Sequence, residues 1–431
     1  MKKKILSLIL ISTVAFNFMG CSSNKDEGKS SDNTITVQVE SAWLPYYEKV
    51  RENVIKDIEG ANIEFVEVGS FDHLEILEQT DPTNPDIADV FALPADAQDK
   101  LHKNESLAVI DAEAMAERVG GFKDFKAGLG GTFNIDGEYV AFPFNIETLV
   151  GYVNVENAKN AGIDITKNFE LTDLNYEQML VLPHDCWYGV AFANSVDLEL
   201  LGKNDDGTLY SDVTKEYKDL TEDQQKLFEA LFNYWKEHDE NKTDLWDKEA
   251  AGGYLDSSFT TGEGNAVRID GPWAATNLTS MVGGEENLEV IPLNNITVNG
   301  KPLKHWKSGW GIGINSRIEE DEAKMELAVA FIEELVNPEN AVDLFNATGK
   351  ILENVEPAAY DSVDKMSKKV IDATYDSYNT AMDKPYFSEW DNVWDSWQNA
   401  LLSWSSTQPK NVEEAYLQVK ASFEAMLESI K

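Results

Sequence analysis

Tryptophan is the residue type with the clearest chemical potential in this sequence, because eleven tryptophans occur among 431 residues. An indole ring offers a flat apolar face, against which the C–H face of a sugar ring can pack. Burying ~100 Å² of sugar on one indole contributes roughly 2–3 kcal/mol. Three or four such platforms would supply a micromolar affinity, about −8 kcal/mol, after the costs of ordering. The composition therefore favours a sugar-binding site.

Four of the tryptophans follow one another near the C-terminus at helical spacing: Trp390, Trp394, Trp397 and Trp404. On one helix they would share a face with Leu401. We predict that Trp397 and Trp404 are core residues, because aromatic residues at this spacing usually pack inside. Trp390 and Trp394 lie nearer an irregular segment, so we predict that one of them faces a cleft.

Three further tryptophans lie where predicted strands or connections end. Trp273 follows the Gly271-Pro272 turn after a short buried strand, a position that commonly lines a crevice. A rigid packing turn is the alternative. Trp43 comes just after the first predicted strand, and Trp187 lies in a predicted connection between two lobes. All three are candidate ligand contacts.

Glu147 is the carboxylate with the most informative surroundings, because it follows the apolar run at 141–146. A carboxylate there needs partners, and sugar hydroxyls would be natural ones. A glycosidase would need a second carboxylate as its pair, and the sequence supplies no convincing one. The sequence also lacks a phosphate loop, a nucleophile elbow and a zinc motif. We interpret Cys186, near His184, as a buried thiol beside a surface histidine, and we expect no catalytic residue, metal or cofactor.

The N-terminus has the layout of an export signal. Three lysines at 2–4 precede an apolar run at 5–18, which is shorter than the ~20 residues that span a bilayer. Cys21 directly after Gly20 predicts cleavage and lipidation (palmitate) of that thiol, although Phe18 stands where a leucine is usual. A plain signal peptide followed by a free cysteine is the alternative. The polar residues at 22–33 predict a flexible spacer.

Charge and cysteine content narrow the class of protein further. The formal net charge of −41 disfavours binding to nucleic acid or anionic lipid. With Cys21 lipidated, Cys186 has no partner for an internal disulfide, so the fold depends on core burial. About 400 mature residues exceed what one core usually supports, which suggests two lobes.

From Thr34 onward, short apolar strands alternate with helices, which is the pattern of an α/β domain. Strands are expected at 34–39, 63–68, 87–93 and 266–269, with a hairpin turn at Asp136-Gly137. Helices are expected from Pro45, from the capping box Thr221/Gln224, at 319–336, and throughout the last seventy residues, where no strand is expected.

Four stretches make the chain resemble the maltose/maltodextrin-binding proteins, the extracellular solute-binding subunits of carbohydrate ABC importers. They are 136–147 with its hairpin and Glu147, 259–273 ending in Gly-Pro-Trp, the glycine-rich strand 309–315, and the Trp-rich C-terminal helix followed by 412–415. The resemblance covers nearly the whole mature chain, although most of that length matches only in its pattern of residues.

The resemblance implies an α/β, two-lobe periplasmic-binding-protein-like fold of type II, with a hinge between the lobes. The implied parts are a signal peptide 1–20, a lipidated flexible tether 21–33, an N-terminal lobe 34–147 plus 309–350, and a C-terminal lobe 148–308 plus 351–431. Crossings between the lobes are expected near 145–150, 306–312 and 348–355.

The resemblance also implies roles for single residues. Glu147 matches a sugar-hydroxyl acceptor, Trp273 a stacking platform, and Trp394 (or Trp390, one turn earlier) the stacking tryptophan of the late helix. Trp187 lies about where the family has a stacking tyrosine. The remaining candidate ligand contacts are Asp96, Trp43 and Trp310.

Two departures leave the exact sugar open. Leu93 stands at a family tryptophan position, and 262–271 is one residue longer than the maltose-specific pattern. The implied function is capture of an oligosaccharide, foremost a maltodextrin-type α-glucan, and delivery to the permease of an ABC importer by a monomer anchored on the extracellular face of the membrane. The alternatives are a binder of xylo- or fructo-oligomers, a surface glycoside hydrolase, and an adhesin or sensor.

Overall fold

The structure is a computed structural model that describes residues 33–204 and 206–430. The predicted signal peptide, the lipidation site Cys21 and the tether up to residue 32 lie outside the described residues. Within the described ranges, every helix is too short or too polar to span a bilayer.

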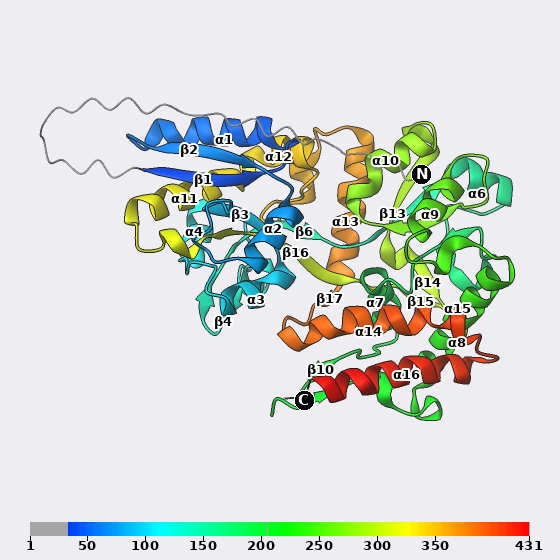
Figure 1. Cartoon of the computed structure of the whole chain (residues 1–431). Coiled ribbons are helices and arrows are strands. Elements are labelled where there is room, and N and C mark those ends of the chain that lie inside the picture. Colours follow the sequence, from blue (N-terminus) through cyan, green and yellow to red (C-terminus); the bar gives the residue numbers. More distant parts are fainter. Residues whose placement is uncertain (1–32, 205, 431) are drawn as a thin grey trace, which may run out of the picture. The chain divides into compact units, whose positions relative to one another are not determined.

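Helices and strands alternate along the first part of the chain, and helices dominate its end (Figure 1). The helices are α1 Leu44–Asp57, α2 Ser70–Gln79, α3 Gln98–Lys103, α4 Ala112–Val119, α5 Leu129–Thr132, α6 Val155–Ala161, α7 Cys186–Ser195, α8 Glu222–Glu240, α9 Ala251–Phe259, α10 Ala275–Met281, α11 Glu322–Leu335, α12 Ala341–Thr348, α13 Lys365–Thr380, α14 Asp391–Leu402, α15 Trp404–Thr407 and α16 Val412–Ser429. The strands are β1 Thr34–Val39, β2 Asn62–Glu67, β3 Val90–Pro94, β4 Asn134–Ile135, β5 Glu138–Tyr139, β6 Phe142–Glu147, β7 Val150–Asn154, β8 Phe169–Glu170, β9 Met179–Leu180, β10 Gly202–Lys203, β11 Leu209–Tyr210, β12 Val267–Asp270, β13 Leu288–Pro292, β14 Ile296–Val298, β15 Lys301–Pro302, β16 Trp306–Ile314 and β17 Met382–Asp383.

The first sheet has the strand order β17-β16-β3-β1-β2, and β6 also pairs with β16. β1 runs parallel to β2 in a register that starts at Thr34 opposite Asn62. Helix α1 packs against α11, and the Tyr46 hydroxyl donates to the Leu335 carbonyl at 2.9 Å. The predicted strands 34–39 and 63–68, the helix from Pro45 and the hairpin at Asp136-Gly137 are confirmed.

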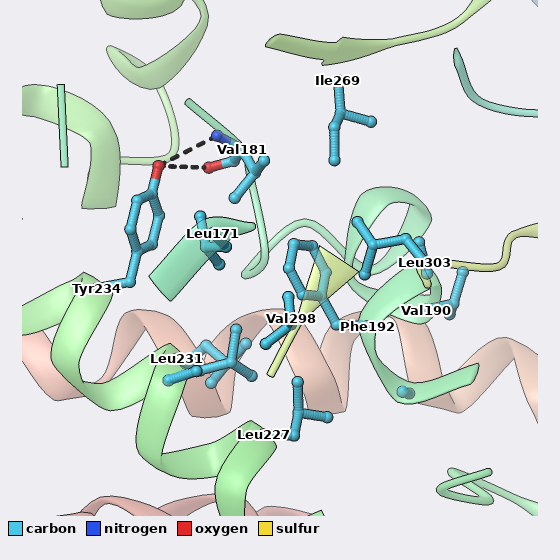
Figure 2. Close-up of a cluster of buried hydrophobic side chains, with 14 of the residues drawn as sticks. Leu171, Val181, Val190, Phe192, Leu227, Leu231, Tyr234, Ile269, Val298 and Leu303 are labelled. Carbon is cyan, nitrogen blue, oxygen red and sulfur yellow. Dashed lines mark hydrogen bonds between the residues drawn. The ribbon is translucent and has the colours of Figure 1, made fainter. Parts of the chain in front are cut away.

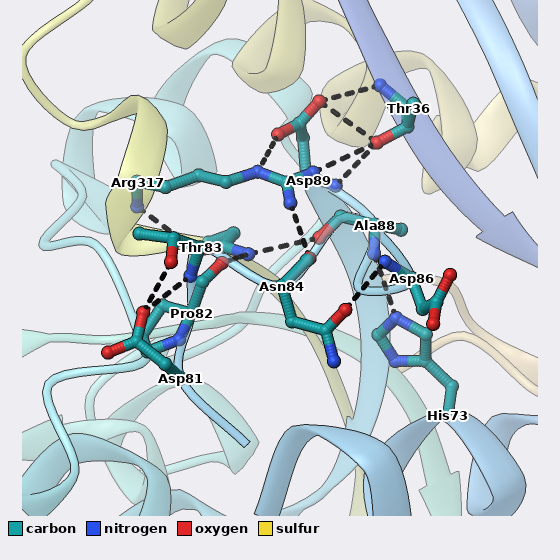
Figure 3. A network of polar contacts seen from close by, with 11 residues as sticks. Thr36, His73, Asp81, Pro82, Thr83, Asn84, Asp86, Ala88, Asp89 and Arg317 are labelled. Atoms are coloured by element: carbon teal, nitrogen blue, oxygen red, sulfur yellow. Dashed lines mark hydrogen bonds and ion pairs between the residues drawn. The ribbon is translucent and has the colours of Figure 1, made fainter.

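The predicted strand 87–93 is wrong at its start, because β3 begins only at Val90. The preceding residues are held in a turn by polar contacts (Figure 3). Asp89 accepts from the Thr36 backbone N–H at 2.8 Å and from Arg317 Nε at 2.7 Å. His73 Nε2 accepts from the Ala88 N–H at 3.0 Å, and burial lowers the pKa of His73 to about 4, so the ring is neutral. Buried polar groups that are paired in this way fix the turn rather than extending the strand.

Strand β16 carries glycines at alternate positions, Gly309, Gly311 and Gly313, which therefore share one face of the strand. A Cβ atom on Gly309 would lie 2.2 Å from the Asn145 carbonyl oxygen, and one on Gly311 would lie 2.5 Å from the Phe133 ring. Side chains alternate between the faces of a strand, so the opposite face presents Trp306, Ser308 and Trp310. The glycines thus let neighbouring elements approach closely behind the strand that carries these side chains.

The second sheet has the order β13-β7-β12-β9 and packs on a separate apolar core, part of which Figure 2 shows. Helix α8 contributes Leu227 and Leu231 to this core. The predicted capping box is present, because Thr221 and Gln224 each accept from the other's backbone N–H. The predicted strand 266–269 is confirmed as β12, shifted by one residue. The assignment of these sheets to lobes with the predicted boundaries and crossings stays a prediction.

The C-terminal region departs from the helix-only prediction at one short strand. β17 pairs with the start of β16, and the Met382 N–H donates to the His305 carbonyl at 2.8 Å. Helix 319–336 also begins later than predicted, at Glu322, because Asp321 caps it and accepts from the Lys324 N–H. Trp397 and Trp404 are fully buried, as predicted.

Glu353 lies at the predicted third crossing, and the burial of its carboxylate can be tested by the pH dependence of stability. One of its carboxylate oxygens accepts from the Leu129 N–H at 2.6 Å, and the other is buried and lacks a hydrogen-bond partner. Burial raises the pKa of Glu353 to about 7. Because the raised pKa belongs to the folded state, stability should fall between pH 4.5 and pH 7 as the unfolded chain ionises first.

We expect Glu353→Gln to remove this pH dependence. Relative to wild type, the variant should gain about 2 kcal/mol at pH 8 and nothing near pH 4.5. That figure is smaller than the full shift implies, because the side chain is partly exposed to solvent. Urea unfolding at the two pH values measures the difference, and an equal effect of the substitution at both would contradict the assignment.

Candidate functional site

Three tryptophans from distant parts of the chain meet at one place. Trp187 lies in the first turn of α7, where Asp185 caps the helix and accepts from the Trp187 N–H at 3.0 Å. Its ring is stacked with that of Trp394 from α14, with centroids 6.5 Å apart and planes 27° apart. Trp306, the first residue of β16, lies edge-on to Trp187 and to Trp394, at 6.3 Å and 5.8 Å. We call Trp187, Trp306 and Trp394 the tryptophan cage.

Lys384 fills the tryptophan cage. Its ammonium nitrogen lies 5.4 Å, 4.8 Å and 5.2 Å from the ring centroids of Trp187, Trp306 and Trp394, within range of cation–π attraction. The side chain is 2 % exposed, and the ammonium forms an ion pair with Asp96, which follows β3. Pairing with a carboxylate offsets the cost of burying the charge.

Neither Lys384 nor Trp306 was among the residues predicted from the sequence. Trp306 had a usable signal, because it opens the glycine-rich strand at a predicted crossing. Lys384 had none, since its place depends on β17 pairing with β16 at Trp306 and Met382. A lysine before a proline in an irregular segment gives no periodicity to read.

Trp390 packs against the tryptophan cage and is more deeply buried than Trp394. It ends a short 3₁₀ helix, η12 (Ser388–Trp390), and is 4 % exposed, whereas Trp394 is half-buried. Its ring lies 4.9 Å from Trp306 and 5.3 Å from Trp394. The four C-terminal tryptophans therefore lie on three successive helical segments rather than on one helix.

Glu147 ends β6, where it pairs in regular register with Ser308 of β16. Its carboxylate accepts from the Trp310 indole N–H at 3.2 Å. Burial raises the pKa of Glu147, and the positive charges of Lys350 and Lys384 oppose that rise.

Trp310 and Trp43 are both buried, and the ammonium of Lys350 lies over both rings. The Lys350 ammonium lies 5.0 Å from the Trp310 centroid and 5.5 Å from that of Trp43. Trp43 also packs edge-on against Phe144 at 6.3 Å, inside the core of the first sheet. The structure thus places Trp43 mainly in the core.

Trp273 is the most exposed of the tryptophans. It lies in a 3₁₀ turn, η6 (Pro272–Ala274), after β12, and it is 52 % exposed. A Cβ atom on Gly271 would lie 2.1 Å from the Trp273 ring, so a larger residue there would displace the ring from its present position. The Gly271 carbonyl accepts from the Tyr152 hydroxyl at 2.9 Å. The ring of Trp273 therefore packs on the backbone at Gly271 and leaves about half of its surface exposed.

The thiol at Cys186 is buried, as interpreted from the sequence, and burial raises its pKa well above the usual value. The expectation of a surface histidine beside it is wrong. His184 is 2 % exposed, and its Nε2 bonds to the Leu245 carbonyl at 2.8 Å. Among the described residues, no group of histidine, cysteine and carboxylate side chains could hold a metal ion.

The comparisons with known proteins agree with this architecture. The family model of bacterial extracellular solute-binding proteins matches residues 60–384. No curated protein matched the chain. Among solved structures, similar ones include the maltose-binding periplasmic protein of Listeria monocytogenes in complex with maltose, at 19% identity and a TM-score of 0.69, covering 93% of this chain and 99% of that one.

Another similar structure is MalX of Streptococcus pneumoniae in complex with maltopentaose, at 19% identity and a TM-score of 0.68, covering 91% of this chain and 99% of that one. An extracellular solute-binding protein of Staphylococcus aureus in complex with maltose has a TM-score of 0.64 at 18% identity, covering 93% and 100%. These likenesses confirm the predicted solute-binding-protein fold. Because the family model matches most of its length, the chain belongs to the bacterial extracellular solute-binding proteins.

Proposed function

We propose that this protein captures an oligosaccharide, a maltodextrin-type α-glucan, and delivers it to an ABC importer. The observation that carries the proposal is the gathering of tryptophan rings beside Asp96, from segments far apart in the sequence. Aromatic faces next to fixed carboxylates are the combination that a sugar needs, because its C–H faces are apolar and its hydroxyls donate hydrogen bonds. The similar proteins bound to maltose and maltopentaose support the same class of ligand.

Each candidate residue has a role in this proposal. The exposed ring of Trp273 and the half-buried rings of Trp394 and Trp187 are the stacking platforms, and Trp390 supports Trp394 from behind. Asp96 and Glu147 accept hydrogen bonds from sugar hydroxyls. Trp310 holds the Glu147 carboxylate in place through a hydrogen bond from its indole N–H. The ring of Trp43 lies against the Lys350 ammonium.

Transport would follow from closure of two lobes about the predicted crossings. A ligand drives such a closure only through its higher affinity for the closed state, so it must contact residues of both lobes. Asp96 and Glu147 belong to the predicted N-terminal lobe, whereas Trp273 and Trp394 belong to the C-terminal one. A sugar held by both sets would stabilise the closed form that a permease reads, with no covalent chemistry.

We further propose that the mature protein is anchored to the extracellular face of the membrane through lipidated Cys21. The motif ending at that residue supports the anchor, and the tether would give an r.m.s. reach of ~20 Å. In cells fed labelled palmitate, the wild-type protein should carry label and sediment with membranes, whereas Cys21→Ser should be unlabelled and soluble. Unlabelled wild-type protein in the medium would overturn the anchor while leaving sugar binding untouched.

The ligand class is tested by titrating intrinsic tryptophan fluorescence with maltotriose, xylotriose and a fructan. We expect a saturable change with maltotriose at micromolar concentration, because several indoles would lose contact with water. Xylotriose and the fructan should act at concentrations at least tenfold higher. The absence of any response to millimolar maltodextrins would refute an α-glucan ligand, and tight binding of xylotriose would transfer the proposal to that class.

Substitution of Trp273 distinguishes a role in ligand binding from a role in packing. Trp273→Ala should weaken maltotriose binding by about 2–4 kcal/mol, since a stacking platform is lost. The stability of the ligand-free protein should change little, because the ring is 52 % exposed.

Trp404→Ala is the matched control, because Trp404 is fully buried and its indole N–H donates to the Ala415 carbonyl at 3.1 Å. It should lower the free energy of unfolding by about 3–5 kcal/mol and leave the affinity of the folded protein unchanged. Titration and urea unfolding of both variants give the four values. A large loss of stability in Trp273→Ala with unchanged affinity would make Trp273 a packing residue.

A further inference from the structure

Lys384 occupies a position that is built for an ammonium group. Three indole rings surround its nitrogen at 4.8–5.4 Å, the Tyr386 ring lies at 5.9 Å, and Asp96 supplies the counter-charge. Aromatic faces grouped around a cation and closed by a carboxylate are the usual recognition site for alkylammonium ligands. In this chain the occupant is one of its own side chains.

Residues around the tryptophan cage also contact its three rings. His305 packs on Trp187 with centroids 4.4 Å apart, and its Nε2 bonds to the Trp187 carbonyl at 2.8 Å. Burial lowers the pKa of His305 to about 3, so this neighbour adds no positive charge. Trp390 supports Trp306 and Trp394 from behind. Contacts with His305 and Trp390 therefore help to hold the three rings in place, in addition to the contacts with Lys384.

The charge at this site is balanced inside a strongly acidic chain. Asp96 and Glu147 are the candidate hydroxyl acceptors, and the ammonium groups of Lys384 and Lys350 lie near them. Without Lys384, the cage would present open indole faces and an unpaired carboxylate. Such a site attracts cations, in a protein whose net charge of −41 already concentrates them.

We propose that Lys384 is a specificity-determining residue, a built-in ammonium that fills the tryptophan cage and so excludes cationic amino sugars in favour of neutral oligosaccharides. The exclusion rests on the proposed sugar-binding function, whereas the filled cage does not. Removing the lysine should convert the cage into a binding site for a free alkylammonium ion.

The first test uses Lys384→Ala with n-propylammonium, which replaces the atoms lost beyond Cβ. The variant should show a saturable change in tryptophan emission at millimolar n-propylammonium and a rise in Tm. Neutral n-propanol, which has the same number of heavy atoms, should produce neither, and wild type should not respond. Lys420→Ala is the matched control, because Lys420 is 13 % exposed and pairs with Glu424 but faces no ring in the cage. No saturable response in folded Lys384→Ala would overturn the proposal.

The second test compares maltotriose with the fully deacetylated glucosamine trimer. Wild type should bind the neutral sugar at least tenfold more tightly, and Lys384→Ala should reduce or reverse that ratio by tenfold or more. An unchanged ratio would overturn the role of Lys384 in specificity.

Two outcomes separate this proposal from the proposed function. If wild type binds neither sugar while Lys384→Ala binds n-propylammonium, sugar binding fails and the filled cage stands. If Lys384→Ala does not fold, Lys384→Met keeps the aliphatic stem without the charge. That variant should lose the discrimination between the two trimers, and retained discrimination would overturn the proposal.

Discussion

The site depends on one strand, β16, and on the close approach of neighbouring elements to its glycines on one face. Gly309 and Gly311 leave no room for a side chain on one face, because the Asn145 carbonyl and the Phe133 ring approach within contact distance of a Cβ atom there. The opposite face carries Trp306 and Trp310. The close approach of the neighbouring elements fixes the strand, and the fixed strand sets where both rings lie. Trp306 then forms a wall of the tryptophan cage, and Trp310 holds Glu147.

Two pairs of charged groups also organise the candidate site. Two lysines lie on aromatic faces, Lys384 in the tryptophan cage and Lys350 over Trp43 and Trp310. Each also lies near a candidate hydroxyl acceptor, Asp96 or Glu147. In a chain of net charge −41, each of these two carboxylates thus has a lysine ammonium near it. A neutral sugar can then exchange hydrogen bonds with groups that are already oriented.

Local patterns predicted the elements well where the signal was local. Alternation in β1 and β2, the capping box of α8 and the hairpin at Asp136-Gly137 depend on neighbours in sequence, and all are present. The start of β3 was predicted too early, because Asp89 is held by Thr36 and Arg317, which are distant in sequence. For the site, composition predicted aromatic platforms, but Lys384 and Trp306 meet only through the pairing of β17 with β16. Tertiary contacts of that kind leave no trace in periodicity.

The central claim is that one oligosaccharide lies between the carboxylates Asp96 and Glu147 and the tryptophans Trp273 and Trp394. A crystal structure of the protein with bound maltotriose tests it most directly. The account predicts sugar rings packed on the Trp273 and Trp394 faces, with hydroxyls donating to Asp96 and Glu147 and with Lys384 still inside the tryptophan cage. Sugar bound elsewhere, or no bound sugar at saturating maltotriose, would contradict it.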